Sequence, residues 1–349
     1  MRFLPAAADT ATRPAPQVCS SSPAQQHSGR GPLLTQRRLQ VTLGLFWLLD
    51  AALQFQPYMF TKAFVANFLA MNAMYQPHAI GELIITVARF LILHAAAWNA
   101  LFATVQLAIA AGLLWRRTVR LALAVSFAWV LGVWAIGEGF GSLLTGIATL
   151  PGGAPGAVLL YGLIGLLVWP RAHQSLPPSG GSVAGEGPLG ERGGRVIWAV
   201  LWCGGAILQI LPGPYPPFSV LGTTINMNLP EPGVLESLDR TVVSLVDRAG
   251  NPLELLLATV EVLIGIHVLR GGQRLRPVLW VGIALSLVFW VVGQNFGGIL
   301  AGHATDPNAG PLYVLLAAVL YPRTGTTGRG EDRTTEVHTT EVRTTEEPT

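Results

Sequence analysis

Two groups of polar side chains lie where the surrounding sequence is apolar. One group lies in a turn that occurs twice, and the other lies inside long apolar runs. Carboxyl, amide and imidazole groups in such places can bind a small molecule, a cation or a quinone headgroup, or can carry protons. The candidate binding residues of the turns are Glu138, Thr149, Gln294, Asn295, His303, Thr305 and Asp306. The candidate intramembrane polar residues are Asp50, Gln54, Gln106, Gln209 and Glu261.

The repeated turn is an eighteen-residue motif whose two copies begin 156 residues apart. Residues 134–151 read WAIGEGFGSLLTGIATLP and residues 290–307 read WVVGQNFGGILAGHATDP, with nine identical positions. The glycines allow tight turns, and the final prolines, Pro151 and Pro307, break a helix. Two interpretations stay open. The polar residues form a ligand site, or they cap helix ends and satisfy the turn's own backbone.

The sequence holds no recognisable catalytic or metal-binding motif. His303 has Ile147 as its counterpart in the first copy, and a lone histidine near one aspartate is a poor metal site. Cys19 and Cys203 have neither a disulfide framework nor a metal-ligand spacing. Nucleotide-binding loops and paired haem-ligating histidines are also missing. We therefore predict no catalytic residues and no metal, and a quinone is the one cofactor that the polar groups suggest.

The polar residues inside the apolar runs need partners. Glu261 lies at the centre of LLLATVEVLIGIHVL and Asp50 lies within LFWLLDAALQF. A charge at mid-bilayer costs roughly 2.5–3.5 kcal/mol on insertion scales, so both side chains should face the bundle interior, paired or protonated. The five intramembrane residues form either a polar chamber for protons or solutes, or hydrogen bonds that hold the helices together.

Composition places these residues in a membrane. The chain has 349 residues, 51% of them hydrophobic and 12% charged, whereas soluble domains carry about 25% charged residues. Its apolar runs approach the roughly 20 residues that cross a bilayer. The lipid bilayer is therefore the first expected partner. Nucleic acid is excluded, because no basic cluster lies beside interleaved aromatic residues.

The apolar runs predict an all-α, polytopic helix bundle with about eight transmembrane helices. These are residues 39–55, 95–115, 119–136, 154–169, 196–211, 253–269, 277–292 and 311–321. With both termini in the cytoplasm, cytoplasmic segments hold 18 of the 22 basic residues, and only Lys62, Arg89, Arg240 and Arg248 lie outside. This asymmetry predicts a multi-pass protein of the cell membrane with both termini inside.

The repeat extends beyond the motif. At an offset of 155, Gln54 matches Gln209, Pro57 matches Pro212, and residues 103–105 match 258–260. We therefore predict two parallel four-helix repeats, residues 37–170 and 195–323, related by a pseudo-two-fold axis along the membrane normal. Polar and Gly/Pro-rich segments predict disorder at residues 1–36, in a linker at 171–194 and in the tail at 324–349.

Two further features concern the outer side. Residues 79–94 and 233–247 are expected to form amphipathic helices, which lie on the membrane surface or form a lid on the bundle. The last apolar run, residues 311–321, spans only about 17 Å as a helix. Either this helix begins earlier, within residues 306–310, or the turn is sunk below the surface. We therefore expect two recessed, outward-facing turns that can line a shared vestibule.

The segment LELLLATVEVLIGIHVLRGGQRLRP has a central glutamate, a glycine one turn later and arginines after its end. It resembles DoxX-like membrane proteins, four-helix units of membrane-bound redox systems that include the DoxD-type subunit of thiosulfate:quinone oxidoreductase. The resemblance implies that Glu261 matches the family's helix-two glutamate, and that Arg274 or Arg276 matches its basic residue. The first repeat departs from this pattern, because it has Gln106 at the position of the glutamate. The chain also resembles Ala-, Gly- and Arg-rich membrane proteins of high-GC bacteria.

Three functions remain open at this point. The first is a non-catalytic DoxX-like membrane component that acts with a redox or stress-response partner. The second is a small-solute or ion transporter or channel that uses a polar chamber around Glu261. The third is a quinone-linked oxidoreductase subunit. The sequence does not indicate an oligomeric state.

Overall fold

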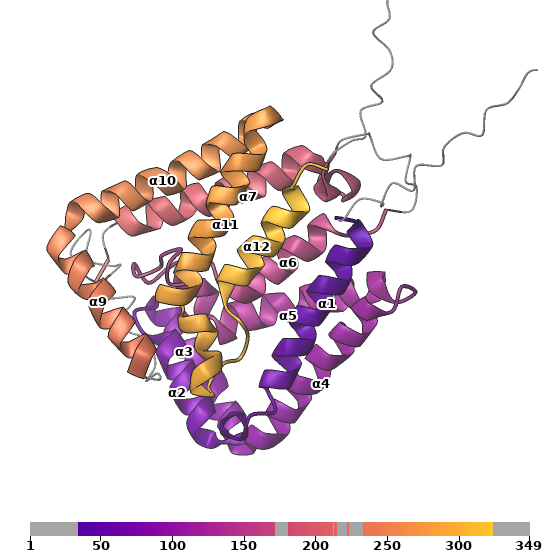
Figure 1. Ribbon diagram of the computed structural model, residues 1–349. Coiled ribbons are helices and arrows are strands. Elements are labelled where there is room, and N and C mark those ends of the chain that lie inside the picture. Colours follow the sequence, from indigo (N-terminus) through magenta and orange to yellow (C-terminus); the bar gives the residue numbers. More distant parts are fainter. Residues whose placement is uncertain (1–33, 172–180, 212, 215–221, 223–232, 324–349) are drawn as a thin grey trace, which may run out of the picture. The chain divides into compact units, whose positions relative to one another are not determined.

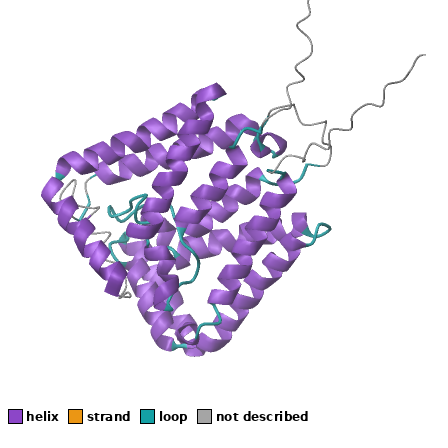
Figure 2. Cartoon of the chain, in the orientation of Figure 1, coloured by secondary structure: helices purple, strands orange, loops and turns teal. Residues whose placement is uncertain are grey.

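The computed structural model describes residues 34–171, 181–211, 213–214, 222 and 233–323. Within these residues all regular structure is helical (Figures 1 and 2). Five helical segments are long and apolar enough to cross a membrane, which fits a membrane protein. They are His78–Leu114, Val119–Gly137, Gly190–Ile210, Asn251–Arg270 and Leu275–Ala301.

Each of the eight apolar runs contains a helix. The helices are α1 (Gln36–Leu53), α4 (Ala95–Leu114), α5 (Val119–Gly132), α6 (Ala157–Leu167), α7 (Gly190–Ile210), α10 (Asn251–Arg270), α11 (Leu275–Val292) and α12 (Ala309–Leu320). The two shortest, α6 and α12, fall below the length of a membrane span. α12 begins at Ala309, so the helix gains only two residues before Pro311.

The helices pack in corresponding ways in the two halves of the chain. α1 lies along α4, and α7 lies along α10. α6 and α12 contact each other and are almost entirely buried. Aromatic pairs anchor this centre, since the Trp47 ring lies 4.7 Å from that of Tyr161 and the Trp202 ring lies 5.8 Å from that of Tyr313. The short helices therefore form the middle of the bundle, between the two long pairs.

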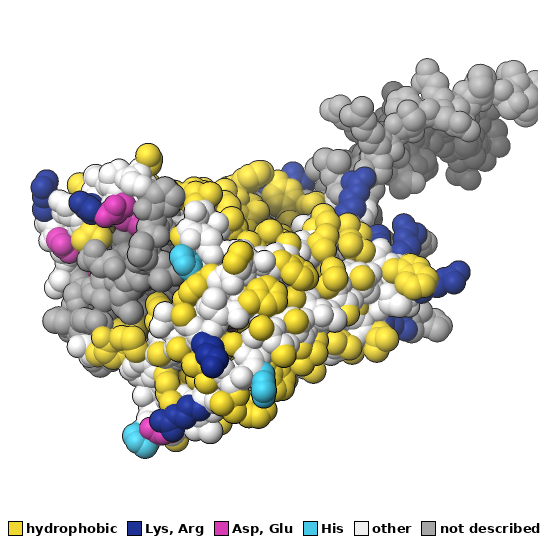
Figure 3. All heavy atoms as spheres, turned by 90° about the horizontal axis from the view of Figure 1, so that it is seen from below, with side chains coloured by type: hydrophobic (Ala, Val, Ile, Leu, Met, Phe, Trp, Pro, Cys, Tyr) yellow, Lys and Arg dark blue, Asp and Glu magenta, His cyan; other side chains and the backbone are white. Residues whose placement is uncertain are grey.

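The outer surface is strongly apolar. Hydrophobic side chains cover much of the face seen in Figure 3, whereas Lys and Arg side chains are sparse there. Leu121, Leu131, Val200 and Leu256 are each at least 60% exposed. Contiguous apolar surface of this kind is typical of contact with lipid.

The segment between α1 and α4 contains a helix that the sequence analysis did not predict. This helix is α2 (Lys62–Ala73), which follows the 3₁₀ turn Pro57–Phe60 and begins where the Thr61 side chain accepts a hydrogen bond from the backbone N–H of Phe64. It packs against α3 (His78–Leu91) as a helical hairpin. α3 then continues through residues 92–94 into α4. α9 (Gly233–Ala249) occupies the second predicted amphipathic segment.

The predicted linker is shorter in the structure. Residues 181–194 are ordered, because Val183–Glu186 form a 3₁₀ turn with Val183 fully buried, and α7 already begins at Gly190. Arg323 pairs with Glu186 and its Nε donates to the Leu34 carbonyl over 2.9 Å. Residues 172–180 lie outside the described residues, as do Cys19 and most of the two predicted disordered termini.

Candidate functional site

The tryptophan that opens each repeated turn donates a hydrogen bond to a proline carbonyl at its end. Trp134 Nε1 donates to Pro155 O over 2.8 Å, and Trp290 Nε1 donates to Pro307 O over 2.7 Å. The sequence alignment paired Pro307 with Pro151 instead. The structural counterpart is Pro155, because the first turn contains four additional residues before its closing proline.

The backbone of both turns enters the left-handed region at the same place. Phe140 has φ 56° and Phe296 has φ 53°, a conformation that costs about 1–3 kcal/mol for a non-glycine residue. Each ring packs on the opening tryptophan, at centroid distances of 5.2 and 4.9 Å. The following residue must be glycine, because a β-carbon at Gly141 would overlap the Pro155 carbonyl.

Glu138 and Gln294 occupy the same motif position and cap the two short helices. Glu138 Oε1 accepts from the backbone N–H of Val158 over 2.9 Å, and Gln294 Oε1 accepts from that of Gly310 over 2.9 Å. Both side chains therefore satisfy donors at a helix N-terminus, as the capping interpretation predicts. Glu138 differs in carrying a carboxyl group, which also interacts with the backbone N–H of Ala157.

The remaining predicted turn residues are also tied into the local structure. Thr149 Oγ1 accepts from Gly152 N over 3.0 Å, and Thr305 Oγ1 donates to Asp306 Oδ2 over 2.9 Å. Asp306 Oδ1 accepts from Asn308 N over 2.7 Å. These bonds fix the Asp306 carboxyl group within the second turn.

Two of the predicted turn residues, Asn295 and His303, contact segments outside the repeated turns. Asn295 Nδ2 donates to Asp239 of α9 over 2.9 Å, and the His303 ring packs edge-on against Tyr58, with centroids 4.6 Å apart. Within the described part of the chain no group of three His, Cys, Asp or Glu side chains could hold a metal ion.

The two turns share one polar cavity, which we call the vestibule. Its volume is about 320 Å³, and residues of both turns line it, including Glu138, Thr149, Gln294, Thr305 and Asp306. The turns also contact each other's half of the chain. Gln56 Nε2, after α1, donates to the Ala304 carbonyl of the second turn over 3.1 Å.

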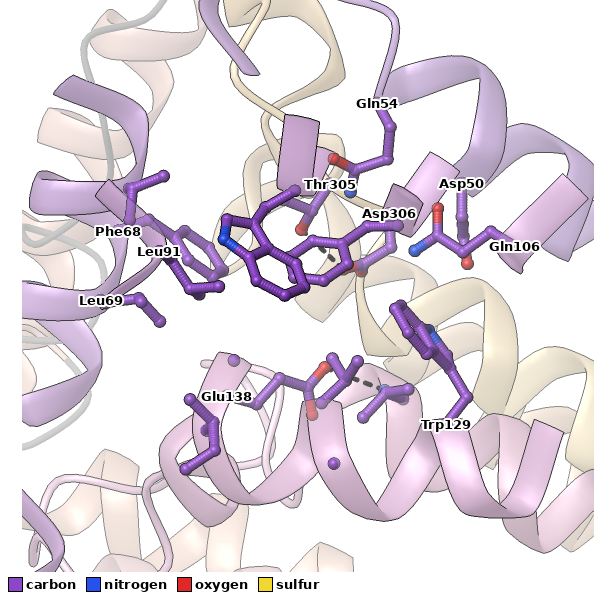
Figure 4. Close-up of a pocket in the computed structure, with 18 of the residues that line it drawn as sticks. Asp50, Gln54, Phe68, Leu69, Leu91, Gln106, Trp129, Glu138, Thr305 and Asp306 are labelled. Carbon is purple, nitrogen blue, oxygen red and sulfur yellow. Dashed lines mark hydrogen bonds between the residues drawn. The ribbon is translucent and has the colours of Figure 1, made fainter. Parts of the chain in front are cut away.

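A second cavity of about 420 Å³, the aromatic chamber, adjoins the vestibule. α2 and α3 form part of its wall, so the hairpin covers the bundle as a lid would. Its aromatic lining residues are Trp47, Phe64, Phe68, Phe90, Trp98, Phe102, Trp129 and Tyr161. In the view of Figure 4, Phe68, Leu69 and Leu91 form one end of the chamber.

The other end of the chamber is polar. Asp50, Gln106 and Asp306 lie together there in the view of Figure 4. Asp50 Oδ1 accepts a hydrogen bond from the Tyr161 hydroxyl over 2.8 Å. Gln106 is 8% exposed and its Oε1 has no partner. Gln54 also lines this end of the chamber.

Glu138 and Asp306 line both cavities and therefore stand at the boundary between them. Burial raises the pKa of Glu138 well above its ordinary value, and the charge of Asp306 raises it further. Burial also raises the pKa of Asp306, against the opposing hydrogen bonds from Thr305 and Asn308. Desolvation and mutual repulsion both disfavour the charged forms, so these carboxyl groups hold protons more readily than exposed ones.

The predicted five-residue polar chamber is divided in the structure. Asp50, Gln54 and Gln106 line the aromatic chamber, whereas Gln209 and Glu261 line neither cavity. Gln209 Nε2 donates to Glu261 Oε2 over 2.7 Å, and Glu261 is fully buried. This pair is thus an inter-helix hydrogen bond between α7 and α10.

Sequence reasoning missed several residues of the site. Tyr161, Asn99 and the α2 side chains were not singled out, although Trp98 and Phe102 have the spacing of one helix face. Asn99 Nδ2 donates to the backbone carbonyl of Gln54 over 2.8 Å and helps to hold the end of α1. Tyr161 was hidden in an apolar run in which its hydroxyl group is the only polar side chain.

Comparison with known protein families, with curated proteins and with solved structures finds no match to this chain. The residues of the two cavities are therefore the basis for any functional conclusion.

Proposed function

We propose that the protein is a non-catalytic integral membrane protein that binds a small amphiphilic molecule in the aromatic chamber. The observation that supports this most directly is the two-ended lining. One end holds Asp50, Gln106 and Asp306, and the other holds aromatic and aliphatic side chains. The volume of about 420 Å³ falls in the range of small-molecule sites, which combine apolar walls with a few convergent polar groups.

The proposal includes the membrane arrangement expected from the sequence. Eight crossings in two parallel four-helix units, with both termini cytoplasmic, would place the two turns on the outer side. The matching Trp–Pro bonds and helix caps of the two turns support this pseudo-symmetry. α12 has 12 residues and spans about 18 Å, less than a hydrocarbon core of about 30 Å. The vestibule would then be recessed and would lead to the chamber from outside.

Ligand binding can be tested in nanodiscs of zwitterionic lipid by tryptophan fluorescence and calorimetry. The probes are 4-phenylbutan-1-ol and 4-phenylbutylamine, which share an aromatic body and differ in the head group. Three tryptophans, Trp47, Trp98 and Trp129, line the chamber and should report occupancy. Saturable binding of either probe supports the proposal, and the absence of binding by both contradicts it.

A cavity-filling variant makes this test site-specific. Gly132 lines the chamber and has open space where its β-carbon would lie. Gly132→Phe should therefore fold and should weaken binding of both probes. Gly204→Phe is the matched control, because Gly204 of α7 also has open space and lines neither cavity. Equal affinity in wild type and Gly132→Phe would place the ligand elsewhere.

Transport is the second candidate function, favoured by the continuity of the vestibule with the chamber at Glu138 and Asp306. Uptake of the labelled amine into proteoliposomes would support it. We would then expect these two carboxyl groups, rather than Glu261, to control the flux.

The DoxX-like relationship and a redox or stress-response partner also remain proposals, and co-purification from native membranes in mild detergent tests them. A quinone would fit the chamber as a ligand, and quinone reduction by the purified protein would support the oxidoreductase alternative.

A further inference from the structure

We propose that the ligand of the aromatic chamber is an organic cation, with an ammonium group held between Glu138 and Asp306 and its apolar body among the aromatic rings. This inference rests on the proposed binding function and names the class of ligand.

The charge balance of the chamber favours a cationic ligand. Its described lining contains three carboxylic acids and no Lys, Arg or His side chain. The described lining of the adjoining vestibule has no basic side chain either. Buried carboxylates without a counter-ion are costly, so they either take up protons or pair with a cation. A cationic ligand would supply the missing positive charge.

The hydrogen-bonding capacity of the site also favours a ligand that donates hydrogen bonds. Gln106 Oε1 is a buried acceptor without a donor. Gln106 is more than nine-tenths buried, and its amide lies at the polar end of the chamber (Figure 4). An ammonium group is a donor-only group with up to three N–H bonds. It would satisfy an excess of acceptors that an ether, a ketone or an anion would leave unsatisfied.

The shape of the site favours an organic cation over a metal ion. The carboxyl groups do not form a cluster that could coordinate a metal in the described part of the chain. Trp47, Trp98 and Trp129 line the same chamber, and tryptophan faces attract organic cations most strongly among the aromatic side chains. Because acids and aromatic rings line the same cavity, the site suits a molecule with a charged head and an apolar body.

The second half of the chain supplies an internal comparison. Gln294 caps α12 with an uncharged amide, as Glu138 caps α6 with a carboxyl group. The capping role therefore does not require the charge of Glu138. At an offset of 155 the counterpart of Asp50 is Gly205, which cannot carry a charge. Two of the chamber acids, Asp50 and Glu138, therefore have uncharged counterparts in the second half, and the second turn supplies the third acid, Asp306.

The test compares the affinities of 4-phenylbutylamine and 4-phenylbutan-1-ol at neutral pH in zwitterionic nanodiscs. We expect the wild type to prefer the amine by at least about tenfold, as for a charge-assisted hydrogen bond. Glu138→Gln and Asp306→Asn should each weaken amine binding by about tenfold or more and leave alcohol binding nearly unchanged. Glu138→Gln should fold, because Gln294 shows that an amide can make the same cap.

Glu261→Gln is the matched control, because it removes a buried carboxyl group that lines neither cavity. It should retain the preference for the amine. Equal affinity of the wild type for both probes would overturn the cation inference and leave the proposed binding function intact. Binding of neither probe would overturn both. An amine preference that survives in both Glu138→Gln and Asp306→Asn would also overturn the assignment of these acids to the ammonium group.

Discussion

Leu150 of the first turn lies so close to Gly205 of α7 that a β-carbon at position 205 would overlap its side chain. Leu150 is 2% exposed. In the motif alignment it is the counterpart of Asp306, and Gly205 is the counterpart of Asp50. Each turn therefore approaches a helix of the other half. The first turn makes an apolar contact with α7 through Leu150. The second turn brings Asp306 to the chamber that Asp50 of α1 also lines.

The close packing of Leu150 against Gly205 should make the stability of the folded protein sensitive to any side chain added at position 205. Gly205→Ala forces a side chain into occupied space and should destabilise the protein by about 1–3 kcal/mol. Thermal unfolding in detergent measures this change. The neighbouring substitution Gly204→Ala is the control, because open space surrounds that position. Equal melting temperatures for the two variants would contradict the tight contact.

The Trp–Pro hydrogen bonds should stabilise the folded protein by a similar amount in both turns. Trp134→Phe and Trp290→Phe each remove the indole N–H and leave a proline carbonyl without its donor, at a cost of about 1 kcal/mol each. A phenyl ring can still pack against Phe140 or Phe296. We expect comparable decreases in melting temperature, and none in Trp115→Phe, since Trp115 is 62% exposed. A loss in one turn only would show that the two bonds are not equivalent.

The cap made by Glu138 should depend on its acceptor oxygen and not on its charge. Glu138→Ala leaves the first N–H groups of α6 without a partner and should cost about 0.5–2 kcal/mol. Glu138→Gln retains an acceptor and should cost much less. Chemical or thermal unfolding of the two variants distinguishes them. If both lose the same stability, the carboxylate charge at the helix N-terminus matters more than the hydrogen bond.

The raised pKa values of Glu138 and Asp306 predict how stability varies with pH. Below their ordinary values of about 4.5 and 3.8 both groups are protonated in the folded and unfolded states. Above these values the unfolded chain releases the protons first, so the folded state binds more protons and stability falls as pH rises toward the raised pKa values. Melting temperature should therefore decrease with pH over this interval. The slope should be smaller in Glu138→Gln/Asp306→Asn, and an unchanged slope would assign the effect to other groups.

The positions of the eight apolar helices could be predicted because each helix lies in a continuous apolar run. α2 was missed because it lies between Pro57 and Pro77, in a segment that was interpreted as a loop. Thr61 was the available signal, since a threonine before an apolar run is a common N-cap. The linker was predicted too long because glycines suggested disorder in residues that the Arg323–Glu186 pair holds in place.

The site was only partly predictable. The motif drew attention to Glu138 and Asp306, but a gap-free alignment paired Pro307 with Pro151 and hid the role of Pro155. The convergence of Asp306 with Asp50 depends on packing between residues 256 positions apart, which no local pattern encodes. Packing between distant segments also separates Asp50, Gln54 and Gln106, which line the chamber, from the Gln209–Glu261 pair.

The crossed contacts of the two turns have a consequence for how such a molecule can be assembled. A pair of identical subunits, each one half of this chain, would carry the same residue at both crossed positions. Two copies of the first half would place Leu150 against Asp50 at both contacts, and two copies of the second half would place Asp306 against Gly205 at both. Two different halves are needed to place Leu150 against Gly205 on one side and Asp306 near Asp50 on the other. Joining two unequal halves in one chain therefore ensures that the apolar contact and the acidic contact always occur together in one molecule.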